Sequence, residues 1–399
     1  MLAPVRVATG IRLAVPWFDM ALAVLHRSGT IARSVSATPT ALRPGRVLRW
    51  RPATNEGCTV CGATARSIVL SSAAIASQLA WLEDFHRRRL TRSARERRTA
   101  LADRASFTQD EPRVIVTCRS CRLVFRHPRQ SADAVERDYA EDRYGASRLA
   151  ALADAQGRAY DAKIALLRRW LPLRRRPRVV EVGSFVGGFL TAAAAAGWDA
   201  LGIDPGEEVV AFCRDRGLTV ERGTLEDAAL AEDAVLAPAS ADAVVVWNTF
   251  DQIPVPGPTL TAAARVLRTG GVLAVRVPNG RYFVEAMLRL QTDGAMARRA
   301  RLLALAWNNL IGFPYLHGYS VGTLDRLMAP FGFERLAAEP DTLLTLADAD
   351  TTRWAALEER VVKAACRLAW RRQIPGPARF AAAPWLDVYY RRGAGTFAR

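Results

Sequence analysis

Lysine is almost missing from this chain, and so is any long apolar run. Only Lys163 and Lys363 among the 56 basic residues of the 399-residue chain are lysines, and the others are arginines. Together with abundant alanine, this bias indicates GC-rich codon usage that acts on the whole chain. No stretch approaches the roughly 18 consecutive apolar residues of a membrane-spanning helix. We therefore expect a soluble, cytoplasmic protein without a membrane span.

The composition also excludes wholesale disorder and a disulfide-stapled miniprotein. Half of the residues are hydrophobic and 24% are charged, whereas disordered chains combine low hydrophobicity with high net charge. The length suggests two domains, or one large domain with appendages.

The formal net charge of +17 belongs to the N-terminal part. Basicity at this level suggests a nucleic-acid or membrane-surface partner. Residues 1–53 carry +7, residues 54–110 carry +3 and residues 111–176 carry +7, whereas residues 177–399 hold 24 basic and 24 acidic residues. A nucleic-acid partner is therefore not favoured, and any such partner would contact the N-terminal part.

Residues 1–53 are predicted to be a flexible basic leader. They are rich in Arg, Ser, Thr, Ala and Pro, with Asp19 as their one acid and no sustained periodicity. Such an acid-poor leader also resembles a mitochondrial transit peptide. Translation from a later start, for which Met20 is a candidate, is a further alternative.

Four cysteines form two C-x-x-C pairs, Cys58 with Cys61 and Cys118 with Cys121. Each pair has the ligand spacing of a zinc knuckle, and four thiolates leave no open position on a tetrahedral ion. The pattern predicts a structural Zn²⁺ site in a module spanning residues 54–130. The alternative is two thiol pairs that are redox-active or carry no metal.

Helical patterns lie inside and after this module. Leu79, Leu82 and Phe85 recur at helical spacing between the cysteine pairs, which predicts a helical insertion over about 73–105. Residues 131–177 are predicted to be a helical linker.

From residue 178 onward, short apolar runs alternate with helical patterns. These runs predict buried parallel strands at 179–182, 200–203, 243–247 and 272–277. The β-α-β-α order predicts a doubly wound, Rossmann-like α/β sheet with right-handed crossovers. The same domain, residues 178–399, is expected to end with a helical cap over 281–330, strands at 333–337 and 385–391, and a helix over 352–372.

The segment 179–190 (VVEVGSFVGGFL) has the pattern of a strand, a glycine-rich turn and a helix. Gly183 permits a sharp turn, and Gly187 lets a ligand approach the main chain. Asp204 follows the next strand, where a carboxylate can accept hydrogen bonds from both hydroxyls of a ribose. Phe185 replaces the middle glycine of G-x-G-x-x-G and crowds a diphosphate. A tight turn without a ligand is the alternative.

This stretch resembles motif I of class I S-adenosylmethionine (SAM)-dependent methyltransferases, in which an acidic residue precedes the glycine turn. The resemblance implies a seven-stranded sheet and SAM as the cofactor. It places Glu181, Gly183 and Gly187 at the amino-acid end of SAM, with Phe185 in the same turn, and Asp204 at the ribose. Three further segments extend the match: 223–227 (GTLED), 247–253 (WNTFDQI) and 268–279 (RTGGVLAVRVPN).

The resemblance assigns the other cofactor-binding residues to two of these segments. Leu225, Glu226 and Asp227 would flank the adenine. Asn248 and Phe250 would lie beside the sulfonium and the substrate.

The resemblance extends in both directions from this core. Residues 116–129 (VTCRSCRLVFRHPR) and 138–144 (DYAEDRY) look like the zinc-binding N-terminal module of a subset that includes C-methyltransferases of deoxysugars. Residues 317–320 (HGYS) resemble the region after the core of that subset. The chain departs from the subset in two places. The segment between its cysteine pairs is longer, and Asp251-Gln252 replaces the usual Glu-His pair after the fourth strand.

Methyl transfer to a hydroxyl or a carbon acid requires a general base. The candidate catalytic residues are Asp251, at the end of the fourth strand, and His317 and Tyr319 from the cap. A loop carboxylate or a helix cap is the alternative role for Asp251, and packing in the cap is the alternative for His317 and Tyr319.

The favoured function is methyl transfer from SAM to a small-molecule acceptor, such as a sugar, a lipid-linked compound or a secondary metabolite. An RNA methyltransferase that uses the basic N-terminal module is a second candidate. Residues 248–250 (NTF) lack the Asp/Asn-Pro-Pro-aromatic pattern of nucleic-acid amino-methylating enzymes. A non-catalytic SAM-binding module is the third candidate, and the sequence does not name the acceptor.

Overall fold

The computed structural model describes residues 57–95, 114–141, 144–156, 159–172, 176–308, 316–344, 350–371, 380 and 382–394. The predicted leader, 1–53, lies outside the described residues, and so does part of the predicted insertion. None of the helices within the described ranges combines the length and the apolar character needed to cross a membrane.

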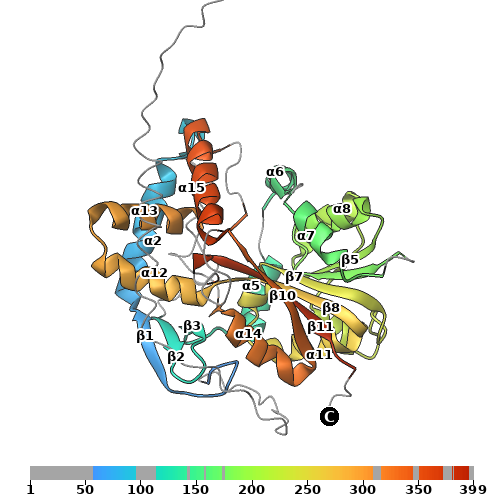
Figure 1. Cartoon of the computed structure of the whole chain (residues 1–399). Helices are drawn as coiled ribbons and strands as arrows, with labels where there is room; N and C mark the ends of the chain where they lie inside the picture. The colour runs from blue at the N-terminus through green and yellow to red at the C-terminus, as the bar shows by residue number, and fades with distance from the viewer. Residues whose placement is uncertain are drawn as a thin grey trace, which may run out of the picture.

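A seven-stranded sheet lies at the centre of the C-terminal part of the chain, from residue 178 onward (Figure 1). Its strands, in the order in which they pair, are β10 (Phe333–Asp341), β11 (Trp385–Arg392), β8 (Leu267–Pro278), β7 (Ala241–Trp247), β4 (Arg178–Val182), β5 (Asp199–Asp204) and β6 (Val220–Arg222). The strands from β8 to β6 are parallel, and β11 is antiparallel to both of its neighbours. The Rossmann-like α/β sheet predicted from the sequence is thus confirmed.

The order of the strands reverses at β4. The chain runs outward from β4 through β5 to β6 and then returns to place β7 on the other side of β4. A crevice forms at such a reversal, outside the carboxyl ends of the strands. The connecting helices are α8 (Gly188–Ala195), α9 (Glu207–Asp215), α10 (Leu225–Leu230) and α11 (Pro256–Val266).

The central strands are apolar because helices cover the sheet. All seven residues of β7 are buried, as expected for a parallel strand that packs on both faces. The edge strand β6 has only three residues, of which Val220 alone is buried. The sequence did not predict it, because three residues are too few for a hydrophobic pattern.

The cysteine module shares a second sheet with the cap. This sheet has the order β1 (Arg66–Leu70), β2 (Val114–Cys118), β3 (Val124–His127) and β9 (His317–Gly318). The cap strand β9 pairs with β3 through Val124 opposite Gly318 and Phe125 opposite His317. Cys58, Cys118 and Phe125 belong to the same hydrophobic cluster as Val180 of the central sheet. The module and the C-terminal part therefore have a continuous core.

Helices complete both halves (Figure 1). The described part of the insertion contains α2 (Ser72–Arg87) and α3 (Arg92–Arg95). The predicted linker contains α5 (Ala132–Glu141), α6 (Ala146–Gln156) and α7 (Asp161–Leu167). The C-terminal half adds α12 (Gly280–Thr292), α13 (Ala295–Trp307), α14 (Val321–Met328) and α15 (Arg353–Arg371).

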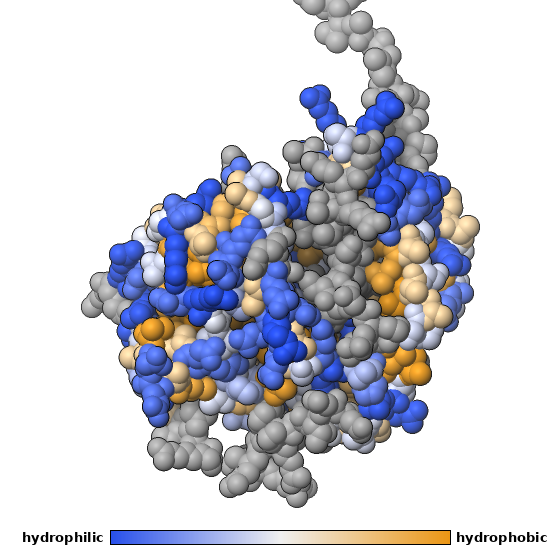
Figure 2. Space-filling view, turned by 180° about the vertical axis from the view of Figure 1, so that it is seen from behind, coloured by the Kyte–Doolittle hydropathy of each residue, from blue (hydrophilic) through white to orange (hydrophobic). Residues whose placement is uncertain are grey.

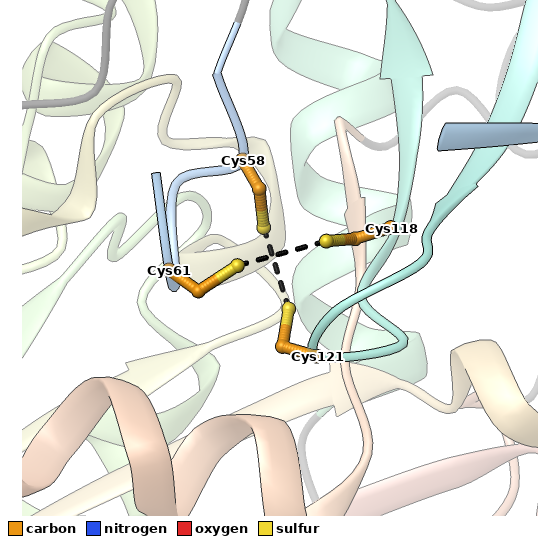
Figure 3. Close-up of side chains that lie close together, drawn as sticks. All are labelled: Cys58, Cys61, Cys118 and Cys121. Atoms are coloured by element: carbon orange, nitrogen blue, oxygen red, sulfur yellow. Dashed lines mark hydrogen bonds between the residues drawn. The ribbon is translucent and has the colours of Figure 1, made fainter. Parts of the chain in front are cut away.

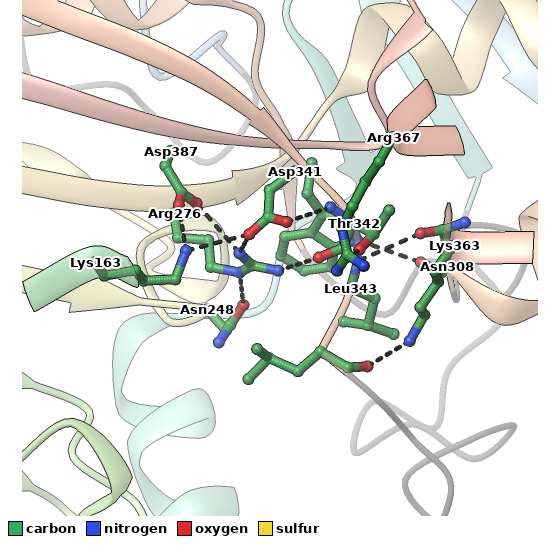
Figure 4. A network of polar contacts seen from close by, with 12 residues as sticks. Lys163, Asn248, Arg276, Asn308, Asp341, Thr342, Leu343, Lys363, Arg367 and Asp387 are labelled. Atoms are coloured by element: carbon green, nitrogen blue, oxygen red, sulfur yellow. Dashed lines mark hydrogen bonds and ion pairs between the residues drawn. The ribbon is translucent and has the colours of Figure 1, made fainter. Parts of the chain in front are cut away.

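Buried charges join α7 to the last strands of the sheet (Figure 4). The Arg276 side chain is fully buried on β8, and its guanidinium pairs with Asp341 of β10 and Asp387 of β11. Lys163 of α7 pairs with the same two carboxylates. Burial alone would raise the pKa of Asp341, but Arg276 and Lys163 hold it below its usual range. Each charge in this cluster therefore has a partner of opposite sign.

We predict that Asp387→Asn destabilises the fold by about 3–5 kcal/mol, because removing one member of a buried ion pair leaves uncompensated charge. Equilibrium unfolding in urea measures the change. Asp199→Asn is the matched control, because Asp199 has an exposed carboxylate 3.8 Å from Arg178 and exposed pairs contribute about 0–1 kcal/mol. Equal destabilisation by the two variants would contradict the prediction.

Candidate functional site

A cavity of about 340 Å³ opens where the strand order reverses. This volume lies within the roughly 300–1,000 Å³ of small-ligand sites. The predicted cofactor residues Gly183, Leu225 and Glu226 line it, and α5 forms another part of the wall through Val135 and Tyr139. A smaller hollow of about 280 Å³ lies beside Pro177 and Trp198, before β4 and β5 begin, and is lined by none of the predicted site residues.

The turn between β4 and α8 has the sharp geometry for which the sequence places glycine. Gly183 has φ +71°, and a Cβ there would lie under 3.0 Å from the Thr249 side chain. Gly187 has the same φ and is the N-cap of α8, and a Cβ there would collide with the Leu218 side chain. Phe185 has φ +46°, and its ring lies edge-on to Tyr144 with 5.2 Å between centroids. A side chain at either glycine would therefore collide with a neighbouring residue, so both positions favour glycine.

Asp204 holds this turn against the end of β5. Its Oδ2 accepts a hydrogen bond from the Phe185 N–H at 2.8 Å, and its Oδ1 accepts one from the Gly206 N–H at 2.9 Å. Burial raises the pKa of Asp204, although these two bonds oppose the rise. A carboxylate has about four lone-pair sites, so Asp204 keeps acceptor capacity for a ligand hydroxyl.

Glu181 is a buried carboxyl beneath the turn. It is 2% exposed, and its Oε2 has no hydrogen-bond partner among the described residues. Burial, and then the charge of Asp204, raise the pKa of Glu181 well above its usual value. A buried carboxyl with a free oxygen is a candidate partner for a cationic group of a ligand.

The three residues predicted to flank the adenine, Leu225, Glu226 and Asp227, have different positions in the structure. Glu226 lines the cavity, and its Oε1 accepts a hydrogen bond from the Thr259 hydroxyl at 2.6 Å. Asp227 forms a capping box with Thr224 at the start of α10 and is not part of the cavity wall. Leu225 is fully buried and reaches the cavity.

The segment after β7 places two predicted residues behind the cavity rather than in its wall. Asn248 has φ +57°, and its Oδ1 accepts a hydrogen bond from Arg276 Nε at 2.7 Å. The Phe250 ring is fully buried and lies 5.6 Å from the Tyr319 ring. Asn248 is therefore held by the buried charge cluster.

The three predicted catalytic residues come together although Asp251 lies far from the other two in the sequence. Asp251, His317 and Tyr319 are each 0% exposed, and the His317 and Tyr319 rings lie 5.5 Å apart. Both Asp251 oxygens, both His317 nitrogens and the Tyr319 hydroxyl lack a hydrogen-bond partner among the described residues. Unpaired buried polar atoms are costly, so their convergence marks a candidate site for a polar ligand.

Burial changes the charge states in this cluster. Burial, and then the nearby Arg129, lower the pKa of His317 to about 3, so its imidazole is neutral at pH 7. Burial raises the pKa of Asp251 well above its usual value. Burial, followed by the charge of Asp251, also raises the pKa of Tyr319. At pH 7 the His317 imidazole is a weak base, but it can donate one hydrogen bond and accept another.

The four cysteines converge as the spacing predicted (Figure 3). Their sulfur atoms all lie within 4.8 Å of one another, with Cys58 and Cys121 at 3.4 Å and Cys61 and Cys118 at 3.6 Å. Tetrahedral zinc with Zn–S of about 2.3 Å needs sulfur pairs roughly 3.8 Å apart. The hydrogen bond with Cys121 lowers the pKa of Cys58 to about 5. This donor set fits a closed, structural zinc site.

Residues 153–338 match the family described as "Methyltransferase domain". This segment, just under half of the chain, is similar to that family. It contains the glycine turn, Asp204, the cavity loops and the cluster of Asp251, His317 and Tyr319.

The domain is similar to one curated relative in particular. Ubiquinone biosynthesis O-methyltransferase of Methylococcus capsulatus is 36% identical over 101 residues, which are 24% of this chain and 41% of the relative. The matched part of the chain thus spans less than half the length of that relative.

Solved methyltransferase structures are also similar, at lower identity. Phosphoethanolamine N-methyltransferase 2 of Haemonchus contortus, solved in complex with S-adenosyl-L-methionine, is 15% identical over 68% of this chain and 62% of its own, with a TM-score of 0.42. An S-adenosylmethionine-dependent methyltransferase from Mesorhizobium loti is 19% identical over 58% of this chain and 98% of its own, with a TM-score of 0.38.

The sequence analysis gave no binding role to three residues that line the cavity, Tyr139, Thr249 and Gln252. Thr249 packs on Gly183, and Gln252 donates a hydrogen bond to the Asn248 carbonyl at 2.8 Å. The Tyr139 hydroxyl, from α5, donates a hydrogen bond to the Gln252 side chain. Thr249 and Gln252 belong to the segment 247–253, so the motif was a signal. The position of Tyr139 depends on how α5 packs.

We predict that Gly183→Ala abolishes measurable SAM binding in isothermal titration calorimetry, because its Cβ would collide with Thr249. Gly197→Ala is the matched control, because Gly197 also has positive φ, +78°, but nothing within 4 Å of its Cβ position. The control should cost about 1–2 kcal/mol of stability and leave SAM affinity unchanged. Equal affinities for both variants would contradict the prediction.

We predict that the protein, purified under reducing conditions, contains one zinc ion per chain by inductively coupled plasma mass spectrometry. The double variant Cys61→Ser/Cys121→Ser should lose the metal and unfold more readily, because zinc contributes folding free energy. Cys366→Ser, which changes a cysteine outside the cluster, should keep it. A metal-free protein with unchanged thermal stability would contradict the prediction.

Proposed function

We propose that this protein transfers the methyl group of SAM to a small-molecule acceptor. The observation that most supports the proposal is the fully buried cluster of Asp251, His317 and Tyr319. Asp251 belongs to the segment after β7, which also lines the cavity through Thr249 and Gln252. Methyl transfer is an in-line displacement, so an enzyme contributes mainly alignment and a water-poor site. The cavity and the buried cluster beside it can provide this alignment and this water-poor environment.

The cofactor side of the site has groups that match the parts of SAM. Glu181 offers a free carboxyl oxygen to the ammonium group, and the glycine turn admits the amino-acid end. Asp204 retains acceptor capacity for the ribose hydroxyls. The adenine would lie between Leu225 and the wall that α5 contributes. When bound, SAM supplies an electrophilic methyl group on its sulfonium.

The acceptor side has a candidate base and an orienting group. Asp251 is the candidate base, because burial raises the pKa of its carboxyl well above its usual value and a general base works best with a pKa near the operating pH. The neutral His317 imidazole, with a pKa of about 3, can orient the acceptor through hydrogen bonds. Asp251 lies close enough that its charge raises the pKa of Tyr319. Its free carboxyl oxygens can accept a hydrogen bond from the acceptor or from Tyr319. Arg129 adds positive charge beside both rings, which would stabilise a developing oxyanion.

The chemistry favours a small acceptor over RNA. The three candidate catalytic side chains are completely buried, so a polymer would reach them only after a large rearrangement. The O-methyltransferase name of the curated relative is consistent with a hydroxyl acceptor, and a sugar, a lipid-linked compound or a secondary metabolite all fall within this class. In this proposal, zinc on the four cysteines stabilises β3 and thereby the neighbouring strand β9 that carries His317.

The test uses labelled SAM with fractionated small molecules from a lysate. We predict that Asp251→Asn reduces label transfer by about 10²–10⁴-fold, the usual contribution of a general base, and that His317→Gln reduces it by a smaller factor. SAM affinity measured by calorimetry should be unchanged in both variants. Tyr319→Phe should also have a smaller effect, because the raised pKa of Tyr319 keeps its phenol protonated and therefore unable to accept a proton.

Asp233→Asn, a change in an exposed loop, is the control and should retain full activity. Transfer of label to RNA would contradict the small-molecule proposal. SAM binding without label transfer to any fraction would favour a non-catalytic binding module.

A further inference from the structure

The outward face of α15 carries apolar side chains in a continuous stripe. Trp354, Leu357, Val361 and Leu368 are 54%, 56%, 44% and 40% exposed, and Ala364 between them is also exposed. Their spacing of three, four, three and four residues places all five on one side of the helix. Soluble surfaces rarely gather so many large apolar groups in one row.

The opposite face of α15 fixes the helix to the molecule. Ala355 and Val362 pack in a cluster with α2 and α13, and Trp370 belongs to the main core. Glu359 and Lys363 pair with each other while fully buried, and Lys363 also donates a hydrogen bond to the Leu344 carbonyl at 2.7 Å. The stripe is therefore a second apolar face, separate from the one that the fold uses.

Among the described side chains of α15, the exposed charges beside the stripe are all positive. Arg353, Arg360 and Arg367 are exposed and lie along one flank of it at helical spacing. On the other flank, Arg89 donates two hydrogen bonds to Glu358, at 2.6 and 3.0 Å, which neutralise that acid. The other acid of the helix, Glu359, is buried.

More arginines lie close to the beginning of the helix. The bridge between Leu90 and Thr351 places α3 beside the start of α15, and Arg92 and Arg95 of α3 are exposed. α15 lies at the edge of the molecule next to α2 and α13 (Figure 1). From behind, hydrophobic patches border strongly hydrophilic ones on the side where these helices lie (Figure 2).

An apolar stripe bordered by arginines fits an anionic lipid surface better than a second copy of the chain. Antiparallel pairing of two such helices would bring the arginine flanks together, which is repulsive. Parallel pairing would place Arg353 opposite Glu358 of the other copy, but Arg89 already occupies that carboxylate. A membrane interface accepts tryptophan and leucine at the level of its headgroups. Its phosphates attract arginines.

We propose that α15 is a surface-docking helix that places its apolar stripe on a bilayer containing anionic lipids. The proposal is independent of methyl transfer, because it concerns a face of the protein that contains none of the proposed catalytic or cofactor residues. It would also bring the enzyme to a lipid-linked acceptor.

The test is co-sedimentation of the full chain with vesicles of phosphatidylcholine alone or with about 30% phosphatidylglycerol. We expect binding to the anionic vesicles only, weakening as salt rises. Arg353→Gln/Arg360→Gln should weaken binding roughly 30-fold, at about fivefold per arginine. Leu357→Ser/Val361→Ser should weaken it roughly tenfold or more.

Two controls separate docking from general effects of charge and hydrophobicity. Arg214→Gln/Arg222→Gln removes two arginines that lie on α9 and β6, and Val235→Ser removes an apolar group that is 56% exposed in a loop. Both controls should bind as the unmodified protein does. Equal losses in the controls and the α15 variants would overturn the proposal, and so would a lack of binding to either vesicle. A lipid-free dimer in analytical ultracentrifugation, abolished by Leu357→Ser/Val361→Ser, would overturn it in favour of self-association.

Discussion

The buried guanidinium of Arg276 connects the sheet to the site. Arg276 pairs with Asp341 and Asp387 on the last two strands, which also hold Lys163 of α7, and it donates a hydrogen bond to Asn248 after β7. A buried charge is stable only when all its partners are in place. The antiparallel strands that close the sheet are therefore fixed in relation to the segment from which Asp251 and Thr249 reach the site.

A second constraint connects the cysteine module to the C-terminal part of the chain, from residue 178 onward. β9 has two residues and pairs with β3, close to the cysteine cluster, and it carries His317. So short a strand has little stability of its own, and its position depends on the sheet of the module. The cysteine cluster is distant from the methyltransferase domain in sequence, but it supports the cap residues that meet Asp251.

The distribution of charge looks different in three dimensions. Residues 177–399 are neutral in sum, and yet the exposed face of α15 is positive, because Glu359 is buried and Glu358 is neutralised by Arg89. The sequence alone also gives no role for the two lysines, Lys163 and Lys363. In the structure, both are buried in ion pairs. The net charge of a segment therefore does not give the charge of its exposed surface, because folding buries some charged side chains and pairs others with charges of opposite sign.

The sequence by itself determined mainly the local features of this protein. Apolar runs predicted the strands β4, β5, β7 and β8, and the glycine spacing predicted the turn at Gly183, because each depends on neighbouring residues. The cysteine cluster joins residues 57 and 63 positions apart, and it was predictable because a tetrahedral zinc site needs four ligands and each C-x-x-C pair supplies two. Only the tertiary structure decided the pairing of β9 with β3, the meeting of Asp251 with His317, and the cavity wall formed by Tyr139. These depend on contacts between segments that are far apart in the chain, and hydrophobic periodicity carries no information about such contacts.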